Sequence, residues 1–316
     1  MILVHVDHDR GTIDPVSLQA LTLARSLDAD VQAVVCGTGA TATVADLAEH
    51  GASVVHIGEH PSLGDFTPQA AGRIVTQAAA ALAPAAVLAG GTPRGNEVLA
   101  HAAAIMDLPL ATECVAISLG SPTTVTRTRW GGNLLEDAVL EGSPALATVV
   151  AHAVPATTAP AAGEVRTFAA DLEPADLVVS LTDRIGAATG GVGLTEARVV
   201  VSGGRGAGGP EGFAIIDELA ALLQGSVGCS RVVTSAGWRP HSEQVGQTGT
   251  KVAPDLYLAC GISGATQHLA GCKNAKVLVA INTDREAPIM THADYIVVDD
   301  MHTFLPELLA AVKAAR

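Results

Sequence analysis

Aromatic and basic side chains are scarce in this sequence. Phenylalanine, tryptophan and tyrosine make up 3% of its 316 residues, and 18 lysines and arginines stand against 32 aspartates and glutamates, for a formal net charge of -14. Nucleic-acid affinity depends on cations that neutralise phosphates, and single strands also need aromatic rings on which bases stack. The composition therefore predicts no nucleic-acid partner.

The sequence also lacks the marks of a secreted or membrane-spanning protein. Its five cysteines form no CxxC pair, no apolar run reaches the roughly 18 residues of a membrane helix, and no basic segment precedes the apolar start. We therefore expect reduced, buried thiols, no membrane span and a cytoplasmic location. The segment His5-Val-Asp-His-Asp9 could hold a metal, but a strand followed by a turn is the commoner origin of such a pattern.

The length and the order of apolar segments predict two α/β domains. A chain that is 48% apolar and 16% charged can fill two cores. In the first half, short apolar segments alternate with segments of helical periodicity, which predicts a mostly parallel sheet with helices on both faces. The predicted strands are 2–6, 31–35, 54–57 and 86–89, and the predicted helices are 15–27, 41–50, 67–82 and 96–106.

Between residues 115 and 150 the pattern changes. Four short strand candidates (115–119, 125–129, 133–139 and 145–150) are separated by Gly, Ser and Pro turns, which favours antiparallel additions to the sheet. The Pro/Ala/Thr-rich segment 151–163 is predicted to be an exposed loop. The glycine-rich stretch 183–194 is predicted to hold the boundary near residue 190, which gives domains 1–190 and 191–316.

After that boundary the alternation of strands and helices resumes. A helix starts at Pro210 with Ile216 and Leu219 on one face, and residues 304–315 are predicted to form the last helix. This is the pattern of a doubly wound sheet, in which ligands bind at the carboxyl ends of the strands. The predicted strands are 199–201, 232–235, 256–260, 277–281 and 295–298.

The first of four dense loops in this domain is Gly204-Arg-Gly-Ala-Gly-Gly209, which matches GxGxxG. Such glycines let backbone N–H groups and a helix N-terminus approach a pyrophosphate. A nicotinamide site would add an acid about 20 residues later, at the end of the next strand. Thr234-Ser235 stand there instead, and Arg205 inside the loop is also unlike a nicotinamide site. Another dinucleotide is favoured over NAD and over a purely structural glycine turn.

The other three loops are Ser230-Arg231, Val245-Gly-Gln-Thr-Gly249 and Gly261-Ile-Ser-Gly-Ala-Thr-Gln-His268. Each alone would be an ordinary turn or helix end, but four in one sheet predict one cofactor site. Glutamine and threonine between glycines suit the edge of a heterocycle. A further loop, 90–95, could cradle an anion, although a strand-to-helix turn is simpler. With no HExxH motif and no Ser-His-Asp order, the chemistry is expected to be electron transfer by a bound cofactor.

These motifs resemble the C-terminal domain of the electron transfer flavoprotein alpha subunit, over about 120 residues. Two departures stand out: the family usually has lysine directly after Gly-Gln-Thr-Gly, whereas Thr250 precedes Lys251 here, and Thr266 replaces an apolar residue. The first could change the partner surface or the field at the flavin. The resemblance is carried by Ser202-Gly-Gly-Arg-Gly206, Ser230-Arg231, Val245-Gly-Gln-Thr-Gly249, Val252-Ala-Pro-Asp-Leu-Tyr257, the run from Gly261 to Gly271, Ala280-Ile-Asn-Thr-Asp284, Ala287-Pro-Ile289 and Ala293-Asp-Tyr295.

The resemblance implies a non-covalent FAD in the C-terminal domain and a heterodimer with a beta subunit, which in this family usually carries AMP. Three residues would tune the flavin: Arg231 against the isoalloxazine ring, Thr248 near N5, and His268 as a donor near O2. Reduction places negative charge on the N1/O2 side of the ring, so a cation or donor there stabilises the reduced flavin.

The same resemblance assigns the remaining FAD ligands. Arg205, Ser263 and Gln267 would serve the pyrophosphate and ribityl region. The others are Gln244 and Gln247 at the ring, Asn282 and Asp300 at the adenosine half, and Gly204, Gly206, Ser230, Gly249 and Gly261 in the loops.

The function that the resemblance implies is electron carriage rather than catalysis by this chain alone. Electrons would pass from flavin dehydrogenases, such as the acyl-CoA dehydrogenases of fatty acid oxidation, to a membrane quinone reductase. One alternative is a subunit of an NADH-oxidising or bifurcating flavoprotein complex. The missing ribose-binding acid disfavours a nicotinamide site in this subunit, but the beta subunit could supply one. The other is a nucleotide-sensing or structural subunit, which the complete set of expected flavin ligands disfavours.

Overall fold

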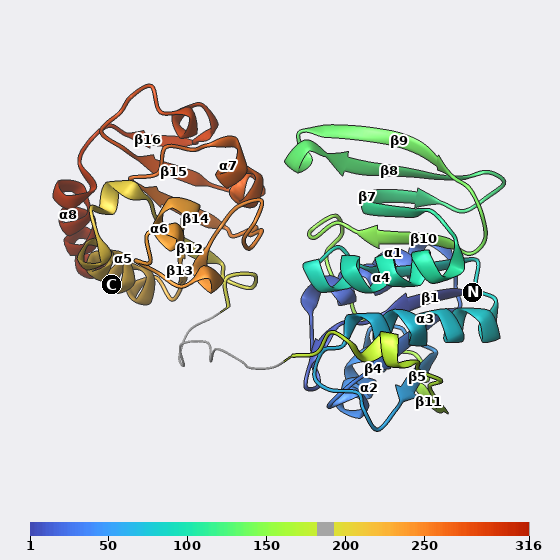
Figure 1. Cartoon of the computed structure of the whole chain (residues 1–316). Coiled ribbons are helices and arrows are strands. Elements are labelled where there is room, and N and C mark those ends of the chain that lie inside the picture. Colours follow the sequence, from blue (N-terminus) through green and yellow to red (C-terminus); the bar gives the residue numbers. More distant parts are fainter. Residues whose placement is uncertain (182–192, 316) are drawn as a thin grey trace. The chain divides into compact units, whose positions relative to one another are not determined.

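The computed structural model describes residues 1–181 and 193–315, which form two compact units (Figure 1). Unit 1 comprises residues 1–184 and unit 2 residues 185–316. Each unit is built on its own sheet with an apolar core on either side of it, so the predicted α/β class is confirmed. The predicted boundary near residue 190 lies outside the described residues.

The sheet of unit 1 has nine strands in the order β11-β5-β4-β1-β6-β10-β7-β8-β9. Only β7–β8 and β8–β9 pair antiparallel. Its strands are β1 (Ile2–His5), β4 (Val31–Cys36), β5 (Val54–Glu59), β6 (Ala86–Gly90), β7 (Leu110–Ser118), β8 (Thr123–Arg129), β9 (Leu134–Leu140), β10 (Ala145–Val149) and β11 (Glu164–Ala169), with a small hairpin β2 (His8–Asp9) and β3 (Thr12–Ile13) beside it.

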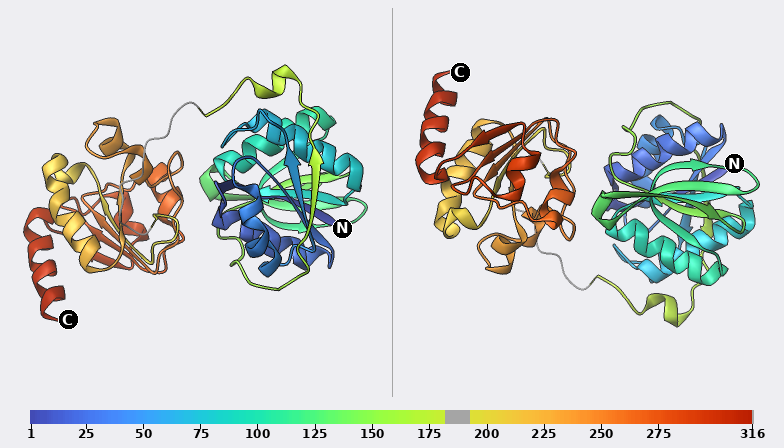
Figure 2. Two further views of the ribbon diagram at one scale, coloured as in Figure 1. Left: turned by 90° about the horizontal axis from the view of Figure 1, so that it is seen from below. Right: turned by 90° about the horizontal axis from the view of Figure 1, so that it is seen from above.

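Four helices cover the two faces of this sheet. The helices α1 (Pro15–Leu27) and α2 (Val44–Glu49) pack on one face, and α3 (Pro68–Leu82) and α4 (Pro93–Met106) pack on the other. Figure 2 shows the two helical layers on either side of the strands. The strands between them read as almost unbroken apolar runs, because a parallel sheet covered on both faces is buried on both.

Local sequence explains where the helices begin. Asp14 caps α1 by accepting a hydrogen bond from the Val16 N–H at 2.8 Å, and Pro15 occupies the first helical turn. Thr92 caps α4 in the same way through the Gly95 N–H at 2.9 Å. Proline suits this position because its missing N–H would have no partner in the first turn.

Two features of unit 1 differ from the prediction. The segment predicted at 145–150 as an antiparallel addition is β10, a fully buried strand that lies between β6 and β7 and is parallel to both. Its apolar residues suit a strand buried on both faces, and only the non-local order of strands reveals its direction. The edge strand β11 was not predicted, because its residues are mostly exposed and it pairs with β5 alone.

Unit 2 is a doubly wound sheet of five parallel strands in the order β13-β12-β14-β15-β16. One core packs α5, α6 and α8 against the sheet, and the other packs α7 on the opposite face. The strands are β12 (Val199–Gly203), β13 (Ser226–Cys229), β14 (Leu256–Cys260), β15 (Leu278–Ile281) and β16 (Tyr295–Val297), and the helices are α5 (Ala214–Leu222), α6 (Arg231–Ser235), α7 (Thr266–Cys272) and α8 (Met301–Ala314).

The prediction of a strand at 232–235 was wrong, because those residues form α6 and the strand is the preceding segment β13. The β-branched run Val232-Val-Thr234 favours a strand, whereas Ser226-Val-Gly-Cys229 has little intrinsic preference, so tertiary pairing with β12 overrides local propensity. The correction matters for function. It moves Ser230-Arg231 from a helix end to the carboxyl end of a strand.

The five cysteines are unpaired in the structure. All five cysteines are free thiols, and all are buried except the half-buried Cys36. Burial raises the pKa of the Cys260 and Cys272 thiols to about 12, so both stay protonated. Within residues 1–181 and 193–315, no helix has both the length and the apolar character that crossing a bilayer requires.

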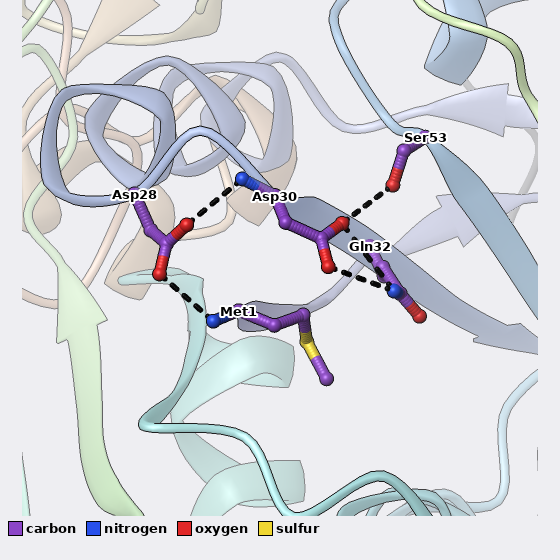
Figure 3. Close-up of polar contacts among 5 residues, drawn as sticks. All are labelled: Met1, Asp28, Asp30, Gln32 and Ser53. Carbon is purple, nitrogen blue, oxygen red and sulfur yellow. Dashed lines mark hydrogen bonds and ion pairs between the residues drawn. The ribbon is translucent and has the colours of Figure 1, made fainter.

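A polar cluster joins the amino ends of the first strands of unit 1 (Figure 3). The Met1 ammonium group lies 2.8 Å from an Asp28 oxygen, and the second oxygen of Asp28 accepts from the Asp30 N–H. Ser53 donates to Asp30 at 2.8 Å. These partly exposed contacts connect the end of α1 to β1, β4 and β5, at the edge of the sheet opposite its carboxyl ends.

Candidate functional site

The strand order of unit 2 creates a crevice between β12 and β14. The chain passes from β12 to β13 on one side and then returns to β14 on the other, so the connections leave the carboxyl ends of β12 and β14 in opposite directions. Ligands of doubly wound sheets bind at such a switch point. Here the Gly204 N–H donates to the Cys260 carbonyl at 2.9 Å, and the Gly206 N–H donates to the Gly261 carbonyl at 3.0 Å.

The glycines of these two loops are required by close backbone contact. A Cβ atom on Gly206 would lie 2.6 Å from the Gly261 Cα, and one on Gly204 would lie 2.3 Å from the Gly261 oxygen. Gly261 also has a φ of +63°, which glycine adopts without strain. The GxGxxG loop therefore lies directly against the loop that follows β14.

A cavity of about 1060 Å³ opens at this edge, at the upper end of the range of small-molecule sites. Loops that follow all five strands line it, together with the segment 244–248. Of the predicted site residues, it brings together Arg205, Gly206, Ser230, Arg231, Gln244, Gln247, Thr248, Gly261, Ser263, Gln267, His268, Asn282 and Asp300.

Two predicted residues, Gly204 and Gly249, are not among those that line the cavity. Gly204 packs against the Gly261 loop, and a Cβ on Gly249 would lie 2.2 Å from the Gln244 oxygen. Both glycines therefore support the walls of the cavity through backbone packing.

Charge is distributed unevenly along the cavity. Arg205 and Arg231 follow β12 and β13, whereas Asp284, Asp299 and Asp300 follow β15 and β16 at the other end of the strand order. Guanidinium groups bind phosphate strongly, and carboxylates accept hydrogen bonds from ribose hydroxyls. The arrangement suits an elongated ligand that carries both phosphates and sugars.

Gln244 holds Thr248 in place. Its side-chain amide accepts from the Thr234 hydroxyl at 2.6 Å and donates to the Thr248 Oγ1 at 3.0 Å, and the residue is 2% exposed. Because Thr248 accepts this hydrogen bond, its own hydroxyl proton remains to be donated to a ligand. Gln244, predicted to line the ring pocket, therefore spends its amide groups mainly on orienting Thr248.

Asn282 and Asp300 also have structural partners. The Asn282 side chain donates to the Ile262 carbonyl at 2.9 Å and accepts from the Asp284 N–H. Asp300 caps α8, where one carboxylate oxygen accepts from the His302 N–H at 2.9 Å. Both residues thus hold the ends of the cavity-lining loops, and carboxylate and carbonyl oxygens have lone pairs left for a ligand.

His268 lies in α7 and is 6% exposed. Its Nε2 lies 2.9 Å from the hydroxyl of Tyr257, and its Nδ1 is buried. Burial lowers the pKa of the imidazole to about 4, against a smaller opposing effect of the Val245 backbone, so the ring is neutral near pH 7. His268 therefore contributes to the cavity wall as a neutral ring that is anchored by Tyr257.

The sequence argument missed Tyr257 and several cavity-lining residues. Tyr257 could have been suspected, because a tyrosine in an apolar central strand must find a partner for its hydroxyl. Thr283, Asp284 and Asp299 directly follow β15 and β16, so the rule that ligands bind at carboxyl strand ends would have found them.

The side chains of the alternative metal site in unit 1 contact protein groups instead. His8 Nε2 lies 3.0 Å from the Cys36 carbonyl, and Asp7 lies 3.6 Å from an Arg94 nitrogen. The described parts of the chain contain no group of three or more His, Cys, Asp or Glu side chains arranged to hold a metal.

Comparison with known proteins identifies the family. A family described as "Electron transfer flavoprotein domain" matches residues 2–173, and one described as "Electron transfer flavoprotein FAD-binding domain" matches residues 193–273. The chain belongs to the electron transfer flavoprotein alpha subunit family. Among its relatives, the electron transfer flavoprotein subunit alpha of Mycobacterium tuberculosis is 37% identical over 100% of this chain and 99% of the relative.

Two further relatives have similar coverage. The electron transfer flavoprotein subunit alpha of Thermoanaerobacterium thermosaccharolyticum is 35% identical over 99% of this chain and 97% of the relative. A protein named FixB from Clostridium saccharobutylicum is 34% identical over 99% of this chain and 96% of the relative. The cavity of unit 2 lies largely within the matched FAD-binding domain, and its arginines and its acidic end fit that cofactor.

Proposed function

We propose that this chain is the FAD-carrying subunit of a heterodimeric electron transfer flavoprotein that relays electrons from flavin dehydrogenases to a membrane quinone reductase. The observation that carries the proposal is the cavity of unit 2, which gathers Arg231, Thr248 and His268 beside the phosphate-binding type of loop at Arg205. A carrier must diffuse between its donor and its acceptor, so a cytoplasmic location is part of the proposal. Acyl-CoA dehydrogenases of fatty acid oxidation are the donors we expect.

In this function FAD, when bound, supplies the reversible acceptance of electrons. The chain supplies binding and an electric field. Arg205 and the backbone of its glycine loop would hold the pyrophosphate, with Ser263 and Gln267 beside it. Arg231 would offset the negative charge that reduction brings to the ring, while Thr248 and His268 would donate hydrogen bonds to its edge.

The partner is expected to be a beta subunit that carries AMP, and the β8–β9 arm of unit 1 offers a surface for it. Trp130 is 82% exposed and Leu135 is 68% exposed, and Leu134 and Val139 on the same arm are also exposed. Large apolar side chains gathered on an unpaired edge strand are typical of protein interfaces.

Co-expression with a candidate beta subunit tests the proposal. The purified heterodimer should show a flavin spectrum, be reduced by an acyl-CoA dehydrogenase with its substrate, and pass the electrons on to a quinone reductase. A colourless, flavin-free heterodimer would contradict it. Oxidation of NADH by the heterodimer without an added dehydrogenase would favour an NADH-oxidising or bifurcating complex instead.

The interface needs a test of its own. The Leu135→Asp variant, which places a charge on the exposed arm, should lose the beta subunit during purification. Val165→Asp, on the exposed edge strand β11, provides a matched control. Retention of the partner by Leu135→Asp would assign the interface to another surface.

A further inference from the structure

Arg239 lies in the loop between α6 and the segment 244–248, and its guanidinium group is shared by two carboxylates. The Nε and Nη2 groups donate to the two oxygens of Glu243 at 2.6 and 3.0 Å. The Nη1 and Nη2 groups donate to the two oxygens of Asp217 at 3.1 and 3.0 Å. Charge-assisted hydrogen bonds in this fork geometry are strong and directional. These four contacts, which we call the arginine bridge, join the loop to α5, the helix that carries Asp217.

The guanidinium group also lies over an aromatic ring of the core. Its carbon is 5.3 Å from the centre of the Phe213 ring, and Phe213 is completely buried. That ring packs against the end of β12, because a Cβ on Gly203 would lie 2.6 Å from it. Burial opposes the charge of Arg239, but the hydrogen bonds to Glu243 and Asp217 outweigh burial, so the pKa of the guanidinium is raised. The arginine is therefore a charged anchor on the core, with 21% of its side chain exposed.

The loop around Arg239 has few other anchors. Within residues 235–242, all but Trp238 and Arg239 are exposed, and Trp238 is half-buried against the core of α5. A segment with few buried apolar contacts opens easily unless specific bonds hold it. Because Glu243 is the last residue before the buried Gln244, the arginine bridge fixes the point from which the cavity-lining segment starts.

Gln244 connects this point to two elements of the cavity. Its side chain accepts from Thr234 of α6 at 2.6 Å and donates to Thr248 at 3.0 Å. Helix α6 has five residues and begins with Arg231, so it has few internal hydrogen bonds that could hold its direction. A displacement of Glu243 and Gln244 would therefore move Arg231 and Thr248 together.

We propose that Arg239 is a positioning residue that binds Glu243 to α5 and thereby keeps Gln244 where it orients Thr248 and the helix of Arg231. The effect of those two side chains on a flavin rests on the proposed FAD function, whereas the hold on the segment 244–248 does not. Arg239 acts at a distance, because it does not itself line the cavity.

The arginine bridge is tested first without the cofactor, in the full-length chain in complex with its beta subunit. Arg239→Met removes the four hydrogen bonds and keeps an unbranched apolar chain over Phe213. Lys313→Met is the matched control, because it removes an exposed ion pair of 2.6 Å to Glu218 on the same helix α5. Amide hydrogen exchange of residues 244–248 should be about tenfold faster in Arg239→Met and unchanged in the control. Unchanged exchange in Arg239→Met would overturn the inference.

Titrations of the same complexes with FAD then separate positioning from a purely structural role. Arg239→Met should bind FAD about tenfold more weakly, and its flavin should be harder to reduce even when the site is saturated. A purely structural role would lower the stability of unit 2 but leave the potential of the bound flavin unchanged, and that result would refute positioning. Lys313→Met should match the unchanged chain in both titrations.

Arg239→Lys tests the geometry of the arginine bridge and also serves if the methionine variant does not fold. Lysine keeps the charge but cannot donate in a fork to two carboxylates, so its exchange rate and FAD affinity should lie between those of the unchanged chain and Arg239→Met. Full recovery in Arg239→Lys would show that charge alone is sufficient and would refute the fork. If the unchanged chain binds no FAD, the proposed function is refuted, and the exchange experiment still decides whether Arg239 holds the segment.

Discussion

The carboxyl edges of the two sheets follow the same rule of chain topology but differ in what fills them. In unit 1, β1 lies between β4 and β6, so a switch point exists there too. The space beside it is taken by the chain itself: Asp7 pairs with Arg94 at 3.6 Å, and the Arg94 guanidinium lies 4.5 Å from the centre of the Phe66 ring. In unit 2 the loops leave an open cavity lined by arginines and neutral donors. Topology permits a site, and the loops decide whether one forms.

The loop 90–95 illustrates the difference. Its hydrogen bonds disfavour the alternative interpretation as an anion cradle. The Gly91 N–H donates to the Val149 carbonyl at 2.7 Å, and the Gly95 N–H donates to Thr92. Donors that would face an anion are thus satisfied internally. In unit 2 the glycine loop instead bonds backbone to backbone with the Gly261 loop and leaves Arg205 at the cavity.

The largest expected effect comes from filling the contact between the two glycine loops of unit 2. Gly206→Val places atoms 2.6 Å from the Gly261 Cα, and should destabilise unit 2 by about 3 kcal/mol and abolish FAD binding. Gly91→Val is an equally crowded change in unit 1, with a contact of 2.7 Å to the Val149 oxygen. It should destabilise unit 1 and leave FAD bound. Titration with FAD and hydrogen exchange of each unit distinguish these results, and loss of FAD in both variants would remove the contrast.

The second prediction is that unit 2 becomes less stable in acid because His268 is buried as a neutral ring. The pKa of His268 is lowered from 6.5 to about 4, so the unfolded chain binds a proton between these pH values and the folded one does not. The contribution of the neutral ring to the free energy of unfolding of unit 2 should be fully present above pH 6.5. It should fall by up to about 3 kcal/mol as the pH drops to 4. Urea unfolding between pH 7 and 4.5 measures this slope, and His268→Gln should flatten it.

The contribution of Asp7 to the pH dependence of stability in unit 1 should have the opposite sign to that of His268. Burial raises its pKa from 3.8 to about 6, against the smaller effect of Arg94, so the folded chain binds the proton more tightly. Its contribution to stability is present below pH 3.8 and is lost as the pH rises to 6. Asp7→Asn should therefore steepen the loss of stability in acid. An equal slope in Asp7→Asn and the unchanged chain would show that folding does not raise the pKa of Asp7.

A smaller effect is expected from replacing one arginine at the carboxyl edge of each sheet by alanine. Arg94→Ala removes the cation beside the partly buried Asp7 and should destabilise unit 1 by about 1–3 kcal/mol at pH 7, with less effect at pH 5. Arg231→Ala removes an exposed side chain, so stability should change by less than about 0.5 kcal/mol while the flavin becomes harder to reduce. Urea unfolding at pH 7 and pH 5 checks Arg94→Ala, and a redox titration checks Arg231→Ala. An unchanged titration of Arg231→Ala would remove its proposed role.

The smallest effect is expected at the amino edge of unit 1, in the polar cluster of Figure 3. Ser53→Ala removes a hydrogen bond to Asp30 at a partly exposed site and should cost less than about 1 kcal/mol, because such groups are solvated in both states. Thermal unfolding provides the measurement. A change as large as that of Arg94→Ala would mean that the amino edge contributes as much as the carboxyl edge.

Prediction from the sequence succeeded where short-range patterns carry the information. The alternation of apolar strands and amphipathic helices, the start of α1 at Pro15 and the glycine loop after β12 are all visible locally, whereas α4 begins at Pro93 and not at Asn96 as predicted. Arg231 was placed in the site although its strand and helix were interchanged, because the motif does not depend on the element that carries it. The direction of β10 and the existence of β11 were missed, because pairing partners far apart in the chain decide them.

The sequence by itself determined that this protein has two α/β halves and that four polar loops follow or precede the strands of the second. Those properties depend on periodicity and on turn-forming residues. Only the tertiary structure decided that Asp7 and Arg94 close the first carboxyl edge and that the second stays open. It also decided that Tyr257, in a strand, forms a hydrogen bond with His268, in a helix. Contacts between residues of different elements depend on how the chain packs, and no local pattern encodes them.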